Sequence, residues 1–281
     1  MIISASRRTD IPSYYSEWLV NRLKEKYVLV RNPMNIHQVS KIDLSPDVVD
    51  AIVFWTKNST PMLSYLDQIN DYTYYFQFTL SAYGPDVERN LPSKNKIIIP
   101  TFQQLSKEIG KEKVIWRYDP IFFNEQYSIE YHCKYFEVLA SKLGDYTEKC
   151  TVSFMDMYRN TERNVKLLSI VKDTYEMQVE LLQRFVEIAK EYGLYIDTCA
   201  EIGDFHNIGV EHAHCIDRER IERIGGFKLN VDKDTNQRAE CGCVASIDIG
   251  AYNTCKNGCL YCYANYSSCL LYTSDAADDL T

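Results

Sequence analysis

The chain has 281 residues, and its 46% hydrophobic and 25% charged residues are typical of a folded globular protein. Its formal net charge of -8 disfavours a nucleic-acid partner, because an acidic chain repels phosphate unless its basic residues gather on one face. The first residues lack the apolar stretch of a signal peptide, and no segment has the length of a membrane span. We therefore expect a cytoplasmic protein with no membrane partner.

Short β-branched and aromatic runs recur along the chain, and most precede a helical pattern. They predict strands over residues 2–5, 51–55, 74–80, 113–118, 150–155, 194–199 and 244–249. Several runs are apolar through most of their length, as strands buried on both faces are. Amphipathic patterns predict helices over residues 14–26, 128–143 and 177–192, with Gly144 and Gly193 placed to end the last two.

Strand–helix alternation of this kind predicts an α/β fold with a parallel sheet. About seven units in this length favour a (β/α) barrel or partial barrel. An open doubly wound sheet is the alternative. Residues 27–44 interrupt the alternation and predict a hairpin inserted beside the barrel. We expect one domain over residues 1–268, with a C-terminal cysteine loop at 250–266.

Residues 269–281 are expected to be a non-native tail. The string from Cys269 to Asp279 resembles a translated transposase adapter used in library preparation. Such segments do not contribute to fold reasoning, and Cys269 is not a candidate ligand.

Polar or ionisable side chains follow nearly every predicted strand. In a parallel barrel the carboxyl ends of the strands share one rim, where barrel active sites lie. Loops are polar in any fold, so the collective pattern carries more weight than any single residue. The candidates for binding carboxylate or phosphate groups are Arg7, Arg8, Lys57 and Arg117, and those for hydroxyl, amino or proton-transfer roles are Asp10, Asp119 and Glu201.

Cys255, Cys259 and Cys262 form the strongest motif in the sequence. Ferredoxin-type [4Fe–4S] clusters take four cysteines, so a loop with three thiolates would leave one iron open for a substrate or cofactor. Gly258 lets the backbone turn tightly beside the sulfurs. A structural zinc site is the alternative, and it would need further sulfurs from elsewhere in the chain.

A second group comprises Cys199, Cys215, Cys241 and Cys243. Four cysteines could bind an auxiliary [4Fe–4S] cluster or a zinc ion. The alternative is that they are small buried residues, because free cysteine is among the most buried residue types. Cys199 ends a predicted strand, and Cys241 and Cys243 precede the strand that leads into the first motif. We therefore expect the four sulfurs to converge beside the barrel mouth.

The spacing Cys-x3-Cys-x2-Cys, with Tyr261 before the last cysteine, resembles the radical S-adenosylmethionine (SAM) signature. Residues 259–264 also resemble the version found in spore photoproduct lyase and its relatives. Through residues 4–10, 54–58, 116–120 and 248–255, the whole recorded chain resembles an uncharacterised bacterial family, domain of unknown function 1848. That family's C-terminal cysteines are similar to the N-terminal cluster motif of radical SAM enzymes. Because the cysteines follow the last predicted strand, the resemblance implies a circularly permuted arrangement.

The resemblance implies a [4Fe–4S] cluster whose open iron chelates SAM and yields a 5′-deoxyadenosyl radical for hydrogen abstraction from an unknown substrate. Tyr261 would place its backbone near the adenine, with Tyr252 and Asn253 also at the cofactor. A small molecule is the implied substrate, and the reductant would be a protein such as flavodoxin or ferredoxin. One alternative is an iron–sulfur binding or electron-transfer protein that does not cleave SAM. The other is a nucleic-acid repair enzyme similar to spore photoproduct lyase, which the acidic charge disfavours.

Overall fold

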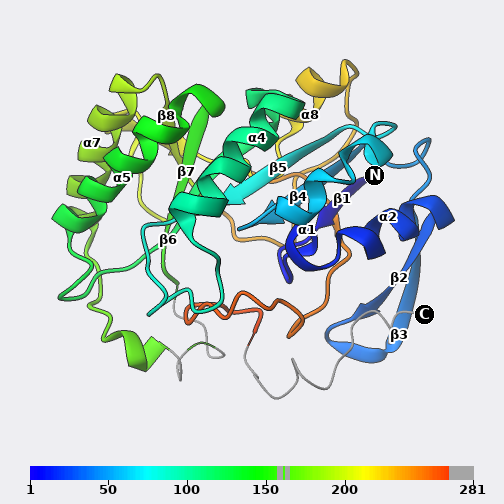
Figure 1. Ribbon diagram of the computed structural model, residues 1–281, viewed down its shortest axis with the longest axis horizontal. Helices are drawn as coiled ribbons and strands as arrows, with labels where there is room; N and C mark the ends of the chain where they lie inside the picture. The colour runs from blue at the N-terminus through cyan, green and yellow to red at the C-terminus, as the bar shows by residue number, and fades with distance from the viewer. Residues whose placement is uncertain (157–160, 162–164, 266–281) are drawn as a thin grey trace.

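The computed structural model describes residues 1–156, 161 and 165–265, so the predicted tail at 269–281 lies outside the described residues. Within that part of the chain, eight parallel strands form one sheet in the order β10-β1-β4-β5-β6-β7-β8-β9 (Figure 1). The strands are β1 Ile2–Ala5, β4 Ala51–Thr56, β5 Tyr74–Thr79, β6 Val114–Ile121, β7 Lys149–Phe154, β8 Tyr195–Thr198, β9 Glu211–His212 and β10 Ile247–Asp248.

The strand order is sequential except that the last strand returns to the first. Ile3 of β1 aligns with Ile247 of β10, so the first and last strands are neighbours. The α/β class and the parallel sheet are confirmed. Hydrogen-bonded closure of a barrel is not seen among the described residues, because β9 and β10 stand at opposite ends of the order. Each of these strands has only two residues, which offers few backbone groups for pairing.

Four longer helices pack on one face of the sheet (Figure 1). They are α2 Ser16–Glu25, α4 Ile99–Ile109, α5 Ile129–Leu143 and α7 Tyr175–Glu191. The shorter helices are α1 Ile11–Tyr14, α3 Thr60–Leu63 and α8 Arg218–Gly225, and single helical turns lie at residues 66–69, 94–98, 111–113, 144–146, 166–168 and 206–208. No helix in the described ranges combines the length and apolarity needed to cross a membrane.

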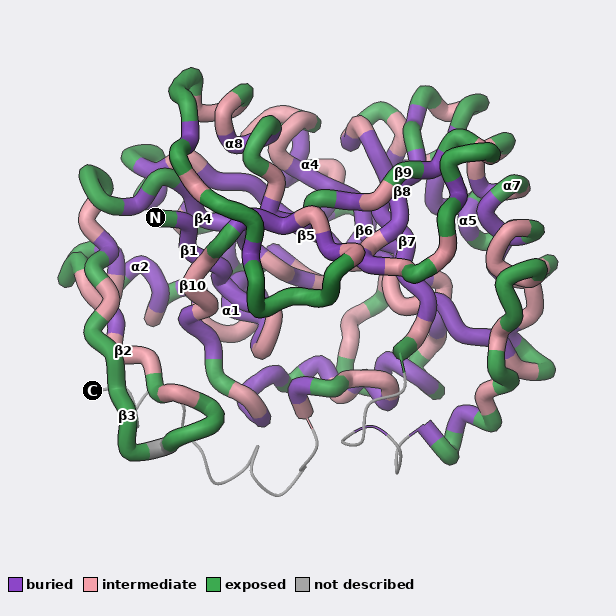
Figure 2. Tube along the Cα trace, turned by 180° about the vertical axis from the view of Figure 1, so that it is seen from behind, coloured by how far each residue is buried: buried purple, intermediate pink, exposed green. Residues whose placement is uncertain are grey.

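Strand side chains alternate between the two faces of the sheet, and both faces are buried. Phe76 and Trp116 face the helices, and the Trp116 ring stacks on Phe136 of α5 at 4.9 Å between centroids. Tyr75 and Ile115 face the other side, where chain from 213 to 244 covers them. Figure 2 shows the central strands buried along most of their length. Burial on both faces explains the continuous apolar runs in the sequence.

The ends of α5 and α7 follow from short-range chemistry. The Ser128 hydroxyl accepts a hydrogen bond from the Tyr131 backbone N–H and caps α5. Gly144 lies so close to α7 that a Cβ there would stand 2.7 Å from the Tyr192 carbonyl oxygen. Gly193 follows α7 with φ of 68°, the left-handed conformation in which glycine ends helices. The two predicted helix ends are thus confirmed, although Gly144 acts through close approach.

The predicted hairpin at residues 27–44 is confirmed. Strands β2 Tyr27–Asn32 and β3 Asn35–Asp43 pair antiparallel as a separate two-stranded sheet. The Leu44 N–H donates to the Lys26 carbonyl at 2.9 Å and closes the base of the hairpin beside α2. Much of β3 is exposed (Figure 2), so the hairpin is an addition to the core and not part of it.

His132 of α5 is a buried histidine that uses both ring nitrogens. Its Nε2 lies 3.0 Å from the Phe122 carbonyl oxygen, which can only accept, so Nε2 carries the proton. Its Nδ1 therefore accepts from the Tyr118 hydroxyl at 2.9 Å. Burial lowers the pKa of His132 from 6.5 to about 4.

This histidine should make stability depend on pH. The unfolded chain binds a proton near pH 6.5 and the folded chain near 4, so stability present above pH 6.5 is lost as the pH falls to 4. We expect the loss to reach about 3 kcal/mol. His132→Gln is the matched control, because an amide keeps one donor and one acceptor but does not titrate. Urea unfolding of both proteins between pH 7 and 4 measures the difference, and parallel pH profiles would contradict the prediction.

Candidate functional site

A cavity of about 480 Å³ lies at the carboxyl ends of the parallel strands. Residues that follow β1, β4, β7 and β8 line one part of it, and the C-terminal loop lines another. In parallel α/β folds this edge of the sheet is where ligands bind. All seven cysteines predicted as metal ligands line this one cavity: Cys199, Cys215, Cys241, Cys243, Cys255, Cys259 and Cys262.

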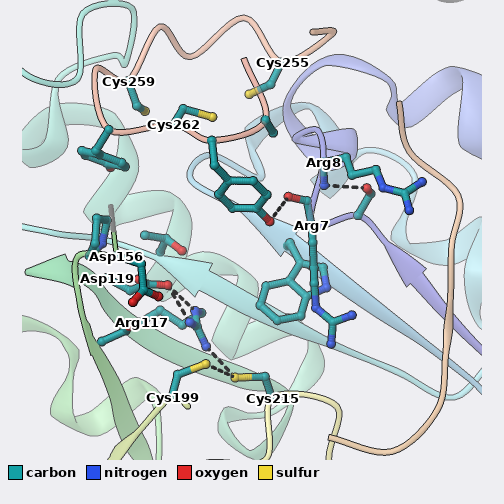
Figure 3. A pocket seen from close by; sticks show the side chains of 18 of the residues that line it. Arg7, Arg8, Arg117, Asp119, Asp156, Cys199, Cys215, Cys255, Cys259 and Cys262 are labelled. Carbon is teal, nitrogen blue, oxygen red and sulfur yellow. Dashed lines mark hydrogen bonds and ion pairs between the residues drawn. The ribbon is translucent and has the colours of Figure 1, made fainter. Parts of the chain in front are cut away.

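The two groups of cysteines lie at different ends of the cavity (Figure 3). Cys255, Cys259 and Cys262 come from the C-terminal loop, and Cys199 and Cys215 lie beyond Arg117 on the opposite side. The predicted charged residues stand between and around them. Those that line the cavity are Arg7, Arg8, Asp10, Lys57, Arg117 and Asp119.

Trp55, at the end of β4, separates two arginines in the cavity wall. The Arg7 guanidinium carbon lies 5.1 Å from the Trp55 ring centroid, and that of Arg117 lies 5.3 Å from it. The Trp55 indole N–H donates to Ser4 Oγ at 3.1 Å, which fixes the ring against β1. Cation–π contacts of this kind hold guanidinium groups in place without neutralising them.

Arg117 is buried and contacts a carboxylate and a cysteine sulfur. Its Nη2 pairs with Asp119 Oδ2 at 2.5 Å, and its Nη1 donates to Cys215 Sγ at 2.9 Å. Burial opposes the charged form, but Cys215 and Asp119 raise the pKa of Arg117 well above its ordinary value. Arg117 therefore connects the second cysteine group to the centre of the cavity (Figure 3).

The loop carrying Cys255, Cys259 and Cys262 is fixed by its own backbone and by the segment before α4. The Cys262 N–H donates to the Cys259 carbonyl at 3.2 Å, which turns the loop between these residues. The Leu260 N–H donates to the Val87 carbonyl at 3.0 Å. In Figure 3 the three sulfurs face a common space. The loop thus contributes all three cysteines to the cavity lining.

Asp10 holds this loop against β1 and β4. Its Oδ2 accepts from the Lys57 backbone N–H at 2.8 Å and from Asn257 Nδ2 at 3.0 Å. Its Oδ1 accepts from the Ser13 backbone N–H at 3.1 Å and so caps α1. The Tyr14 hydroxyl donates to Asn257 Oδ1 at 2.7 Å and completes the contact with the loop. These hydrogen bonds indicate a positioning role for Asp10.

Glu88 was not identified by the sequence analysis. Its buried carboxylate binds two lysines and Tyr261 of the cysteine loop. Its side chain is 1% exposed and pairs with Lys57 Nζ at 2.8 Å and with Lys94 Nζ. The Tyr261 hydroxyl donates to the same carboxylate. Burial opposes ionisation, but the two lysines lower the pKa of Glu88 to about 2. Tyr261, next to Cys262, is thereby tied to a fixed charge.

Burial disfavours the thiolate form of the three thiols of the loop. Burial raises the pKa of Cys259 to about 12, although Lys57 acts in the opposite direction. Burial also raises the pKa of Cys255 and that of Cys262. Metal binding to such thiols would release protons, because the thiolate is the ligand.

In the second cysteine group, each side chain contacts the next, in the order Cys199, Cys215, Cys243 and Cys241. Cys199 Sγ lies 3.2 Å from Cys215 Sγ, and the side chains of Cys243 and Cys241 continue the series of contacts. Hydrogen bonds from Cys199 and Cys243 lower the pKa of Cys215 well below its ordinary value, and Arg117 acts in the same direction. No set of three or more His, Cys, Asp or Glu side chains in the described ranges forms a preformed metal-binding group.

Three predicted residues lie outside the cavity lining. The Glu201 carboxylate accepts from the Phe154 N–H at 2.8 Å, and burial raises its pKa to about 7. Tyr252 lies under the Arg8 guanidinium, 5.3 Å from its carbon to the ring centroid. The buried Asn253 donates its N–H to the Ala264 carbonyl at 2.8 Å. Asn253 thus joins the two ends of the cysteine loop through its backbone, and Tyr252 packs against Arg8.

The fold and the site together define a parallel α/β protein with a cysteine-lined cavity at its strand ends. The chain belongs to the family described as Domain of unknown function (DUF1848), whose model matches residues 2–264. No curated protein matches the chain. A solved structure described as "a putative alpha-L-fucosidase from Bacteroides thetaiotaomicron" is similar at 11% identity and a TM-score of 0.29, covering 95% of this chain and 87% of that one. That likeness is too weak to support an argument about fold or function.

Proposed function

We propose that this protein is a radical SAM-like iron–sulfur enzyme with a circularly permuted, partial-barrel arrangement. The observation that carries the proposal is that Cys255, Cys259 and Cys262 face one cavity at the strand ends. Their Cys-x3-Cys-x2-Cys spacing supplies three ligands for a [4Fe–4S] cluster and would leave one iron free. β10, which leads into the loop, pairs with β1, and this neighbourhood supports a permuted site.

The residues present fit such a cluster. The three thiols lie at least partly buried on a loop that hydrogen bonds fix at both ends, and the cavity beside them is within the usual size range for a small-molecule site. When bound, the reduced cluster would supply the electron that cleaves the sulfonium of SAM and starts hydrogen abstraction from the substrate.

The chain's own residues would bind and orient the ligands. Arg7, held on the Trp55 ring, presents a guanidinium to the cavity, and it suits a carboxylate or phosphate group. Asp119 lines the cavity beside Arg117 and suits a hydroxyl or amino group. Lys57, paired with Glu88, serves to hold the loop. The loop over the cavity would exclude water from the reacting groups.

The test is anaerobic reconstitution followed by incubation with SAM and a strong reductant. We expect a brown protein with about four irons per chain. We also expect 5′-deoxyadenosine, measured by chromatography and mass spectrometry. The control omits the reductant, which should abolish the product without changing the iron content. A stable cluster without SAM cleavage would favour the electron-transfer alternative. Zinc in place of iron at the loop would overturn both the proposed enzyme activity and the electron-transfer alternative.

A further inference from the structure

Cys199, Cys215, Cys241 and Cys243 come from three separate parts of the chain and meet on the buried face of the sheet opposite the helices. Backbone hydrogen bonds fix their positions. The Cys215 carbonyl accepts from the Tyr75 hydroxyl at 2.6 Å and from Gln77 Nε2 at 2.7 Å, both of β5. The Cys243 carbonyl accepts from the Asp234 N–H at 2.9 Å. The sulfurs are therefore brought together by the fold.

The distance between the Cys199 and Cys215 sulfurs favours a single ion over a cluster. Two sulfurs that bind one tetrahedral zinc ion at about 2.3 Å stand about 3.8 Å apart. Cys199 Sγ and Cys215 Sγ are 3.2 Å apart, so a bound ion would move them apart by roughly 0.6 Å. Sulfurs that bind different irons of a cluster stand much farther apart. All four cysteines are free, so the short contact is not a disulfide.

The surroundings of these sulfurs suit a metal-bound tetrathiolate. The Arg117 Nη1–H donates to Cys215 Sγ at 2.9 Å, and the Ile216 N–H donates to Cys243 Sγ at 3.3 Å. Four thiolates and one divalent ion leave a net negative charge, which needs nearby cations. Arg117 lies in contact and Arg7 interacts electrostatically with Cys215 and Cys243. N–H donors around the sulfurs are the outer-shell contacts that orient metal ligands.

The chain around these cysteines has little regular secondary structure of its own. Residues 226–246 contain no helix or strand among the described elements, yet they cover one face of the sheet. The apolar cluster on this face is much smaller than the one under the helices. A tetrathiolate ion would join β8, the chain after β9 and residues 241–243 at one point. Structural zinc sites stabilise weak cores in this way.

We propose that Cys199, Cys215, Cys241 and Cys243 bind one structural zinc ion, separate from the site of the three-cysteine loop. Small side-chain rotations would convert the series of sulfurs into a tetrahedral set. The inference stands independently of SAM chemistry, because it concerns the other end of the cavity.

The experiment measures metal in full-length protein purified without oxygen from medium containing zinc and iron. In the Cys255→Ala/Cys259→Ala/Cys262→Ala variant, which removes the proposed cluster, we expect about one zinc per chain. Adding Cys241→Ser/Cys243→Ser should lower the zinc content at least about tenfold. Cys133→Ala, on the apolar face of α5, is the matched control and should keep the zinc.

A second measurement covers the case in which the serine variant fails to fold. Cobalt exchanged into otherwise unmodified protein should show the visible spectrum of a tetrahedral tetrathiolate ion. Absence of zinc from the loop-cysteine variant, iron in its place, a cobalt spectrum with fewer than four thiolates, or a Cys199–Cys215 disulfide in anaerobically purified protein would each overturn the proposal. Loss of SAM cleavage with the zinc retained would bear only on the proposed function.

Discussion

Replacing Glu88 with alanine should lower the free energy of unfolding by about 3–5 kcal/mol, because it leaves two partly buried lysines without the carboxylate that they share. Lys57 Nζ pairs with this carboxylate at 2.8 Å, and Lys94 Nζ pairs with its other oxygen. The carboxylate is 1% exposed, so solvent screens these pairs little. Urea unfolding of the metal-free protein measures the loss.

The same substitution should release the cysteine loop. The Tyr261 hydroxyl loses its acceptor, and the segment 87–90 that pairs with the loop loses its central charge. Hydrogen exchange of residues 255–262 should therefore accelerate more than that of β5, which is central in the sheet. Local release without global destabilisation would show that the lysines find other partners.

Two control variants show whether the loss of stability comes from the buried negative charge of Glu88. Glu88→Gln keeps the side-chain volume and one acceptor, so it isolates the loss of the negative charge. Glu137→Ala removes an exposed carboxylate on α5 and should change stability by less than about 0.5 kcal/mol. If Glu88→Ala were as mild as this surface change, the buried ion pairs would not contribute to stability as argued.

The sequence predicted the strands well where burial on both faces left a clear apolar run. β1 and β4 begin at the predicted residues, because tertiary burial and β propensity act in the same direction there. β9 has only two residues, Glu211–His212, with no apolar run to mark it. The predicted strand at 244–249 is reduced to Ile247–Asp248, since the residues before it cover the sheet and do not extend it.

The site was predictable as far as it depends on strand ends. Arg7 and Lys57 follow buried strands, and parallel pairing brings those strand ends together. Arg117, predicted near the end of its strand, lies instead within β6, which continues to Ile121. Glu88 was not predictable in this way. It lies in the loop between β5 and α4, and Lys57 and Tyr261, which contact it, are 31 and 173 residues away in the chain. Only the tertiary fold brings an acidic residue from such a loop to two lysines and a tyrosine.

The three-cysteine loop provides the prediction with the largest effect on metal content. Cys255→Ala, Cys259→Ala and Cys262→Ala should each lower the iron retained after anaerobic reconstitution from about four per chain by at least about tenfold. The physical reason is that removing one cysteine exposes the iron it would bind to water, and the cluster then loses its iron by hydrolysis. Iron analysis and the visible absorption of the cluster measure the result.

Tyr261→Phe is the matched control for these variants, because it changes the same loop but removes only a hydroxyl. It should keep the cluster while losing about 1–2 kcal/mol of stability, since Glu88 loses a buried donor. Cys133→Ala, in the core of α5, should keep full iron content. Full iron in any one of the three loop variants would show that two cysteines and another group bind the metal. An open coordination position for SAM would then have no structural basis, and the proposed chemistry would fail together with the three-cysteine site.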